Sequence, residues 1–532
     1  MTTKPEAQDD SKAKSAYVLY SQGRYGEAFA LYADILKRNP SHYPSLLGYA
    51  EEVTRRGNFK EALNVALRVL VHYGTSNQKS DEGERAGMLF AKLIGQTGSV
   101  PHLLQLMQSS NSKGGAEALD FLARTAMQNG EVGGSIELFR AAIKCYPGSV
   151  KYTNNLIDAL EIVNQFGKAF EVAKWFLQAN ANAEVGGVLC GMVLKAWNEG
   201  NAVIQEEVNV QGPMEPEGIE ENTADSTPKG RIEENTADST PNQAKKPTSY
   251  NEEQLDLLNF YYKIIKLLYV AGLMKAAEAL VFTVQPAKAK GGDLHLTFIR
   301  NSNSYFSYIE ALVNVGDYTG SNERKDKKTL FVMGDSHVLS PAWRTLQLEK
   351  KGEVLMKPLL VTGCKIWHLR KESHFYPKTH FYQLLREVPK QGEVIFMFGE
   401  IDCREGILLA LAKGIYSTLD QGINVVLDIY LEILYQIAFQ KKLHRLYVHP
   451  VPPVLEETRW IITAFNRALG ARLIAIRQKD SKTPLRWLHI ETELLNLGRE
   501  TFKEEYKLDG THLHPHYISL ISDAINTLET YS

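Results

Sequence analysis

The sequence predicts a chain of two parts, a helical repeat array followed by an α/β domain with a parallel sheet. Two observations lead to this prediction. A turn signature that combines a glycine with an aromatic residue recurs after 34 residues, at Gly23 and again at Gly57, as expected of stacked helix pairs. From Thr329 onward, short apolar stretches alternate with longer helical ones, which is the pattern of a parallel sheet covered on both faces.

Composition excludes several classes of protein. A length of 532 residues with 44% hydrophobic and 23% charged residues indicates a globular chain with a repeat array plus one domain, or three to four domains. The formal net charge of -2 gives no basic footprint, so we expect no nucleic-acid partner. The polar N-terminus shows no secretory signal, and no apolar run is long enough to predict a membrane span.

The cysteines and histidines predict neither a disulfide framework nor a metal site. Four cysteines are scattered along the chain without a paired spacing, which fits a reducing compartment, so we expect a cytoplasmic protein. His512 and His514 lack a recognisable third ligand nearby, and no cofactor motif is evident.

Four similar turns mark the N-terminal repeats, at Gly23, Gly57, Gly130 and Asn164. Glycine allows a tight reversal between two helices. An aromatic residue and a small alanine follow, as at Tyr25 in the first turn, and suit close helix packing. The repeats resemble the tetratricopeptide repeat, with room for roughly two more units between the second and third turns. A generic α-solenoid or helical bundle is the alternative. Stacked units form concave surfaces for a protein or peptide partner.

An acidic insertion interrupts the repeats. The decapeptide IEENTADSTP occurs at Ile219–Pro228 and again at Ile232–Pro241, a tandem duplication of 13 residues. Such sequence buries too little apolar surface to fold, so it is expected to be disordered. The predicted organisation is a disordered N-terminus (1–13), repeats (14–202), the insertion (203–249), further repeats with another turn at Gly272 (250–320), a linker (321–328) and the α/β domain (329–532).

The α/β domain is read from its alternation of apolar strands and helices. The predicted strands are Leu330–Met333, Leu359–Thr362, Val394–Phe398, Leu446–His449 and Trp487–Ile490. The predicted helices are Ala342–Lys351, Phe381–Val388, Ile407–Lys441, Glu456–Gln478 and Pro515–Tyr531.

Polar residues at the strand ends suggest a nucleophilic site. Ser336 directly follows the first predicted strand, at the edge of a parallel sheet where ligands bind. Asp509 precedes His512 by three residues on a glycine-containing loop, a spacing that lets the carboxylate orient the imidazole as a general base. Gly363 follows the second strand and offers a backbone N–H to an oxyanion. Ser336 has an alternative role as a helix cap.

These motifs resemble the SGNH (GDSL-type) hydrolases, over about Thr329 to Tyr531. The Gly-Asp-Ser motif matches Gly334-Asp335-Ser336, with His337 in place of the usual leucine, and the late Asp-x-x-His motif matches Asp509 and His512. The resemblance implies a flavodoxin-like α/β/α sandwich. It also implies Ser336 as nucleophile, His512 as base, Asp509 as orienting acid, and the N–H groups of Ser336 and Gly363 as oxyanion donors.

The third family motif, Gly-x-Asn-Asp, is altered. The matching run is Gly399-Glu400-Ile401-Asp402, so either Ile401 occupies the asparagine position or the carboxylate of Asp402 stands there. Neither donates a hydrogen bond when Asp402 is ionised. Arg404 is a candidate to compensate by supplying a cation or by pairing with Asp402. Glu400 and Arg404 are alternatively a structural ion pair.

The resemblance implies a serine esterase or deacetylase that acts on a small ester, such as an O-acetylated carbohydrate. An O-acyltransferase that uses the same three residues is a close variant. The rival interpretation is a non-catalytic tetratricopeptide-repeat scaffold with a degenerate hydrolase domain.

Overall fold

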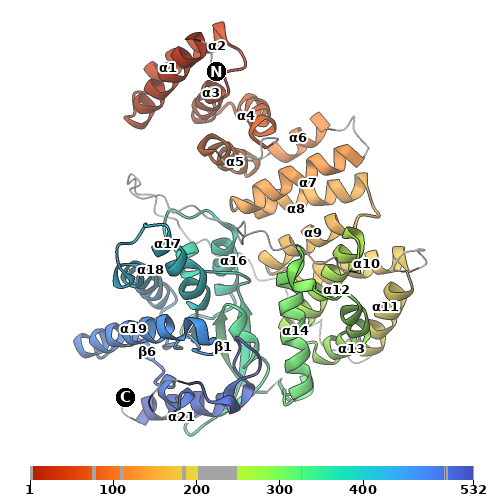
Figure 1. The fold of residues 1–532 in the computed structure, drawn as a ribbon, viewed down its shortest axis with the longest axis vertical. Helices are drawn as coiled ribbons and strands as arrows, with labels where there is room; N and C mark the ends of the chain where they lie inside the picture. Colours follow the sequence, from red (N-terminus) through yellow and green to blue (C-terminus); the bar gives the residue numbers. More distant parts are fainter. Residues whose placement is uncertain are drawn as a thin grey trace. The chain divides into compact units, whose positions relative to one another are not determined.

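The computed structural model describes residues 4–74, 80–96, 98–107, 113–181, 187–201, 249–324, 326–496, 498 and 501–530 (Figure 1). The chain forms two compact units. The first contains Met1–Gln165 and His374–Thr379, and the second contains Phe166–Ser373 and His380–Ser532. The last repeat helices therefore belong to the same unit as the sheet, whereas the sequence places a boundary at the linker 321–328. Nearly all of the predicted insertion (202–248) lies outside the described residues.

The N-terminal half consists of helix pairs, as the repeats predict. The helices are α1 (Lys4–Ser21), α2 (Tyr25–Arg38), α3 (Tyr43–Arg55), α4 (Phe59–Gly74), α5 (Asp81–Ile94), α6 (Ser99–Met107), α7 (Lys113–Gln128), α8 (Val132–Cys145), α9 (Val150–Ile162), α10 (Phe166–Asn180), α11 (Gly187–Asn201), α12 (Glu252–Val270), α13 (Met274–Lys290) and α14 (Arg300–Val315).

The repeat turns share one backbone conformation. The residue between the paired helices has a positive φ at each predicted turn: Gly23, Gly57, Gly130, Asn164 and Gly272. Glycine and asparagine tolerate this left-handed region best. The conformation explains why the turn signature is visible in the sequence.

Two predictions about the repeats differ from the structure. Between the second and third predicted turns lies one further pair, α5 and α6 with a left-handed Gly98, rather than roughly two. Residues 1–13 are predicted to be disordered, but α1 begins at Lys4. The buried apolar residues of this helix include the small Ala13 and Ala16, which give little hydrophobic signal in a polar stretch.

A tight contact within the first repeats offers a test of the packing. Tyr32 of α2 is buried against Gly48 of α3, where a Cβ would overlap the tyrosine ring. A Cβ at Gly26 of α2 would meet nothing within 4 Å.

We predict that Gly48→Ala lowers the free energy of unfolding by about 1–3 kcal/mol, because overpacking forces side chains from their preferred positions. The matched control Gly26→Ala should be neutral or slightly stabilising, since alanine favours helices over glycine. Urea denaturation of the whole chain, followed by circular dichroism, gives both values. Equal stability of the two variants would contradict the prediction.

The C-terminal domain contains a mixed sheet of six strands. The strands are β1 (Lys328–Gly334), β2 (Thr345–Leu348), β3 (Gly352–Leu360), β4 (Glu393–Met397), β5 (Arg445–Val448) and β6 (Leu485–Trp487). Their order is β2-β3-β1-β4-β5-β6. Each of the five predicted strands overlaps an observed one, and these five pair in parallel, with β1 between β3 and β4.

The edge strand β2 is a correction. The sequence predicts a helix at Ala342–Lys351, but Thr345–Leu348 pairs antiparallel with β3. Leu346 and Leu348 are buried, whereas Gln347 between them is exposed, which is the alternation of a strand. Trp343, with a left-handed φ of 60°, precedes the strand in a conformation that a helix does not contain.

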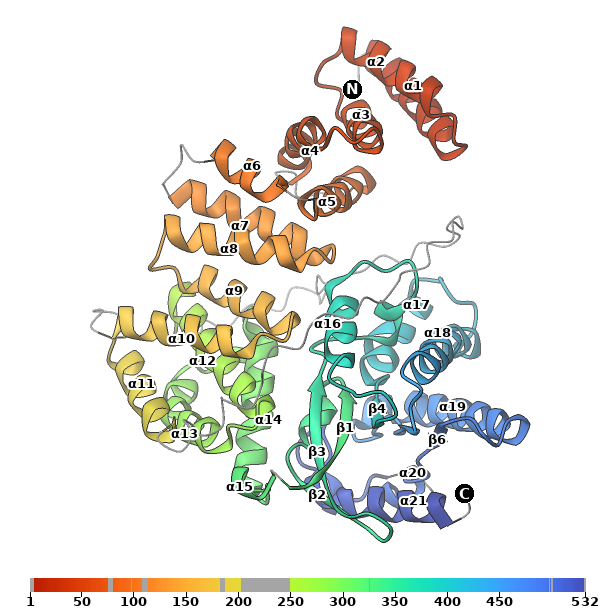
Figure 2. The same ribbon diagram turned by 180° about the vertical axis from the view of Figure 1, so that it is seen from behind.

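Helices cover the sheet. One apolar core joins β1, β3, β4, β5 and β6 to α16 (Tyr376–Leu385), α18 (Leu419–Gln440) and α19 (Arg459–Lys479). Elsewhere α12 packs against β3 and α21 (Ile518–Thr530) against β2 (Figure 2). The single helix predicted over Ile407–Lys441 is divided at a left-handed Gly414, between α17 (Leu408–Ala412) and α18.

Among the described helices, α18 alone is long and apolar enough to cross a membrane. Half of its most apolar window is buried within the protein. The core helix of a soluble domain has the same character, so its composition is weak evidence for a span.

Candidate active site

The site begins where β1 ends. Gly334 is the last residue of β1, and a Cβ there would overlap the Met397 carbonyl of β4. Asp335 then caps the short 3₁₀ helix η3 (Ser336–Leu339), because its Oδ1 accepts a hydrogen bond of 3.1 Å from the N–H of His337. The capping role considered for Ser336 therefore belongs to Asp335.

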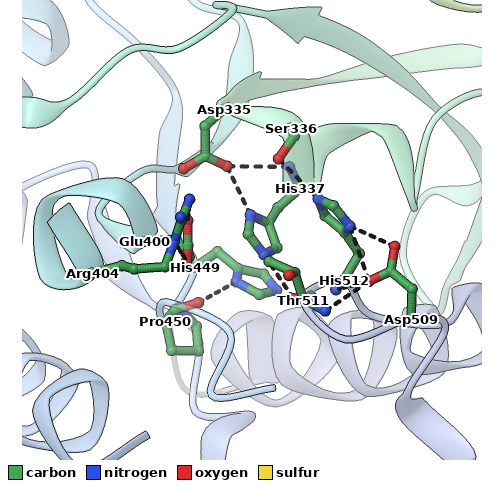
Figure 3. A network of polar contacts seen from close by, with 10 residues as sticks. All are labelled: Asp335, Ser336, His337, Glu400, Arg404, His449, Pro450, Asp509, Thr511 and His512. Atoms are coloured by element: carbon green, nitrogen blue, oxygen red, sulfur yellow. Dashed lines mark hydrogen bonds and ion pairs between the residues drawn. The ribbon is translucent and has the colours of Figure 1, made fainter. Parts of the chain in front are cut away.

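The structure brings Ser336, His512 and Asp509 together (Figure 3). Ser336 Oγ lies 3.0 Å from His512 Nε2. On the other side of the imidazole, Nδ1 lies 2.9 Å from Asp509 Oδ2 and 3.1 Å from Oδ1. The serine follows a central strand, and the other two residues lie on the loop before α21. This order of hydroxyl, imidazole and carboxylate is the geometry of a nucleophile, a base and an orienting acid.

Asp509 is held as a carboxylate. Its Oδ1 accepts hydrogen bonds of 2.7 Å from the N–H groups of both Thr511 and His512. Burial alone would raise the pKa of Asp509, but the hydrogen bonds and the nearby His512 lower it to about 2. The carboxylate thus stays ionised and fixes the tautomer with a proton on Nδ1, which leaves Nε2 free to accept from Ser336.

His512 is poised as a neutral base. Its pKa is lowered chiefly by burial, and the neighbouring His337 lowers it further, although Asp509 acts in the opposite direction. A neutral imidazole is the form that removes a proton from a hydroxyl.

A second Asp–His pair lies directly beside the first. His337 Nδ1 is 2.9 Å from Asp335 Oδ1, and its Nε2 is 3.2 Å from the Thr511 carbonyl oxygen. Both partners only accept hydrogen bonds, so both ring nitrogens carry protons and His337 is an imidazolium. Burial lowers the pKa of His337, but Asp335, Glu400 and the Thr511 carbonyl outweigh it, and the net shift is upward.

Sequence reasoning identified His337 only as a departure from the family's leucine. Its role in joining the β1 end to the 509–514 loop depends on a pairing between residues far apart in the chain. The substitution itself, a histidine directly after the candidate nucleophile, was the only available signal.

The predicted oxyanion residues have different positions. Gly363 lies on the exposed turn after β3 with a left-handed φ of 66°, beside the carboxyl end of β1. Asp402 is buried and accepts from the N–H groups of Ile366 (2.7 Å) and Trp367 (3.1 Å). Burial raises the pKa of Asp402 to about 6 despite these bonds.

Asp402 is therefore a cap for the 3₁₀ helix η4 (Ile366–Leu369), and its prediction as an oxyanion or substrate-binding residue is not matched by its contacts. Arg404 does not pair with Asp402 either. Its Nε lies 2.8 Å from Glu400 Oε1 and its NH1 2.6 Å from Glu405 Oε1. The structural ion pair considered for Glu400 and Arg404 is present.

Metal ligands were also searched for in the described part of the chain. No group of three or more histidine, cysteine, aspartate or glutamate side chains there has the arrangement of a metal site.

Comparison with known proteins identifies the N-terminal repeats. Residues 14–77 match the family model described as "Tetratricopeptide repeat". The chain contains tetratricopeptide repeats. Such repeats stack into surfaces for protein partners, so this region is a protein-interaction module. A search of curated proteins gave no match.

Solved structures similar to the chain include other repeat proteins. PilF of Pseudomonas aeruginosa is 13% identical with a TM-score of 0.18, over 39% of this chain and 95% of that one. A tetratricopeptide repeat protein from Parabacteroides merdae is 12% identical with a TM-score of 0.18, over 56% and 98%. A Naa15/Naa10 complex bound to HypK-THB gives 12%, 0.19, 89% and 64%. At these scores the likenesses carry no argument.

We predict that His337→Leu destabilises the protein by about 3–5 kcal/mol, because it leaves the buried carboxylate of Asp335 without its cation. His444, whose side chain is 61% exposed, is the matched control, and His444→Leu should change stability little. Thermal or urea unfolding of both variants measures the difference. A stability of His337→Leu equal to that of the control would show that His337 is not a structural cation.

Proposed function

We propose that the C-terminal domain is a serine hydrolase of the SGNH type that acts on a small ester, carried by a tetratricopeptide-repeat module that binds a protein partner. The observation that carries the proposal is the continuous hydrogen-bonded chain from Ser336 through His512 to Asp509, with distances of 3.0 Å and 2.9 Å. Three residues in the order and geometry of a triad rarely meet without a catalytic reason.

The strand order supports the same assignment. Without the edge strand β2, the parallel strands lie in the order β3-β1-β4-β5-β6. Counted along the chain, this is second, first, third, fourth and fifth, the order of flavodoxin-like sheets. The site lies at the carboxyl end of β1, next to the point where the order reverses, which is where such folds bind ligands.

The proposed reaction is acyl transfer in two steps. Ser336 Oγ attacks the ester carbonyl as its proton passes to His512 Nε2, and Asp509 stabilises the resulting imidazolium. His512 then gives this proton to the leaving alcohol, which leaves an acyl group on Ser336. Water, deprotonated by His512, attacks the acyl group and releases the acid and the free serine. If another hydroxyl replaces water, the product is a new ester, and the enzyme is a transferase.

The oxyanion would be held by the backbone N–H groups of Ser336 and Gly363. Ile401 occupies the place of the family's asparagine and has no donor in its side chain. Loss of one such donor costs about 10²–10³ in kcat. We therefore propose a slow hydrolase relative to members with the full set.

The second candidate is a non-catalytic scaffold, and one observation favours it. Asp402 and Arg404 are committed to structural contacts with η4 and with Glu400, so neither replaces the missing donor. The intact Ser336, His512 and Asp509 favour the enzyme.

The first test is labelling by a fluorophosphonate probe, which reacts with an activated serine. We predict that the wild-type chain is labelled and that Ser336→Ala is not. Ser417, which is exposed on the same domain, supplies the control, since Ser417→Ala should be labelled like the wild type. Equal absence of labelling in the wild type and Ser336→Ala would favour the scaffold.

The second test is the pH dependence of labelling. The base must be neutral, and the pKa of His512 is lowered, so the neutral form persists below the ordinary histidine pKa of about 6.5. The labelling rate should rise with pH and reach half of its plateau below this value. A midpoint above it would contradict the lowered pKa.

A further inference from the structure

Helices of the repeat array contribute to the candidate active site. Tyr308 on α14 is buried, and its ring lies on the imidazole of His512, with centroids 3.6 Å apart and planes inclined by 8°. This is a face-to-face contact between a residue in the predicted repeat region (250–320) and the proposed general base. Both residues belong to the same compact unit.

The surroundings of His512 are constrained in several directions. Its two nitrogens are held at their edges by Ser336 and Asp509. Tyr308 covers one face, and the ring of His337 lies 5.0 Å away at an inclination of 50°. The hydrogen bonds fix the edges of the ring, whereas only a flat neighbour resists its tilting about the side-chain axis.

The helices that carry Tyr308 are firmly attached beside the site. Tyr269 of α12 donates from its hydroxyl to the Leu339 carbonyl of η3 (3.2 Å), and its own carbonyl accepts from Trp343 Nε1 (2.8 Å). Arg344 NH2 donates to the carbonyl of Gly316 at the end of α14 (2.7 Å). These bonds join α12 and α14 to the segment that directly follows Ser336.

A further contact joins α12 to the other side of the site. Lys266 Nζ donates to Thr362 Oγ1 at 3.3 Å, one residue before Gly363. The two helices thus touch the loop of the proposed oxyanion donor as well as the base.

We propose that Tyr308 is a positioning residue for His512 and that α12 and α14 are part of the active site. The inference rests on the proposed function. Tyr308 acts through the flat face of its ring, since its buried hydroxyl has no hydrogen-bond partner among the described residues. It restrains the imidazole in the plane in which Nε2 meets Ser336 Oγ. A misplacement of about 1 Å at such a site costs on the order of 10²-fold in rate.

The test compares substitutions of buried tyrosines in the same two helices. Tyr308→Leu removes the flat ring, and Tyr308→Phe keeps it and removes only the hydroxyl. Tyr262 of α12 is the matched control. It is buried, its hydroxyl likewise has no partner among the described residues, and its ring packs on Phe306 at 4.5 Å. Tyr262→Leu therefore removes a similar ring away from His512.

The readouts are the rate of fluorophosphonate labelling and the hydrolysis of p-nitrophenyl acetate by the full chain. We expect Tyr308→Leu to lower kcat and the labelling rate about 10- to 100-fold with KM unchanged. Tyr308→Phe should restore the wild-type values. Folded Tyr262→Leu should keep the wild-type rates even if its melting temperature falls as far as that of Tyr308→Leu.

Different failures have different meanings. A wild-type chain that is labelled no better than Ser336→Ala overturns the proposed function. A labelled wild type with equal rates in Tyr308→Leu overturns the inference alone, and so does a loss of rate in Tyr308→Phe.

If Tyr308→Leu does not fold, the wild-type chain still decides the question by NMR. The His512 ring protons, assigned by comparison with His512→Gln, should be shifted upfield by the stacked tyrosine. Unshifted resonances overturn the inference.

Discussion

The close approach of β1 and β4 at Gly334 is the constraint on which the site depends. Only a glycine fits, because any side chain would overlap the Met397 carbonyl, and the strands are held there by the bond from Asp335 N–H to Met397 O (3.2 Å). The chain must turn immediately afterwards, since β1 lies between two neighbours and cannot widen the sheet. The turn places Asp335, Ser336 and His337 at the edge of the sheet, where the 509–514 loop meets them.

Local patterns predicted most of the fold and the three central residues of the site. The 34-residue period was readable because left-handed turns select glycine or asparagine at positions such as Gly57 and Asn164. Strand β2 was not, because Leu, Gln, Glu and Lys favour helices in isolation and its pairing with β3 is decided by tertiary contacts. Tyr308 had no signal at all, since a stack on His512 depends on helix packing and on no local motif.

Buried carboxylates in this domain have two kinds of work, and the sequence does not distinguish them. Asp335 pairs with a cation and joins two distant segments, whereas Asp402 accepts backbone N–H groups and holds the start of η4. Both follow a strand and a glycine, as a catalytic acid would. Only their partners in space show that Asp509 is the carboxylate that reaches His512.

The burial of α12 has a consequence for synthesis of the chain. Every residue from Phe260 to Val270 is buried, so this helix has no face suited to water. It emerges from the ribosome before any strand of the sheet, and the last strand, ending at Trp487, follows roughly 200 residues later. At about 5–20 residues per second this delay is about 10–40 s. During that time α12 is an apolar helix without its partner sheet, and a natural substrate for a chaperone.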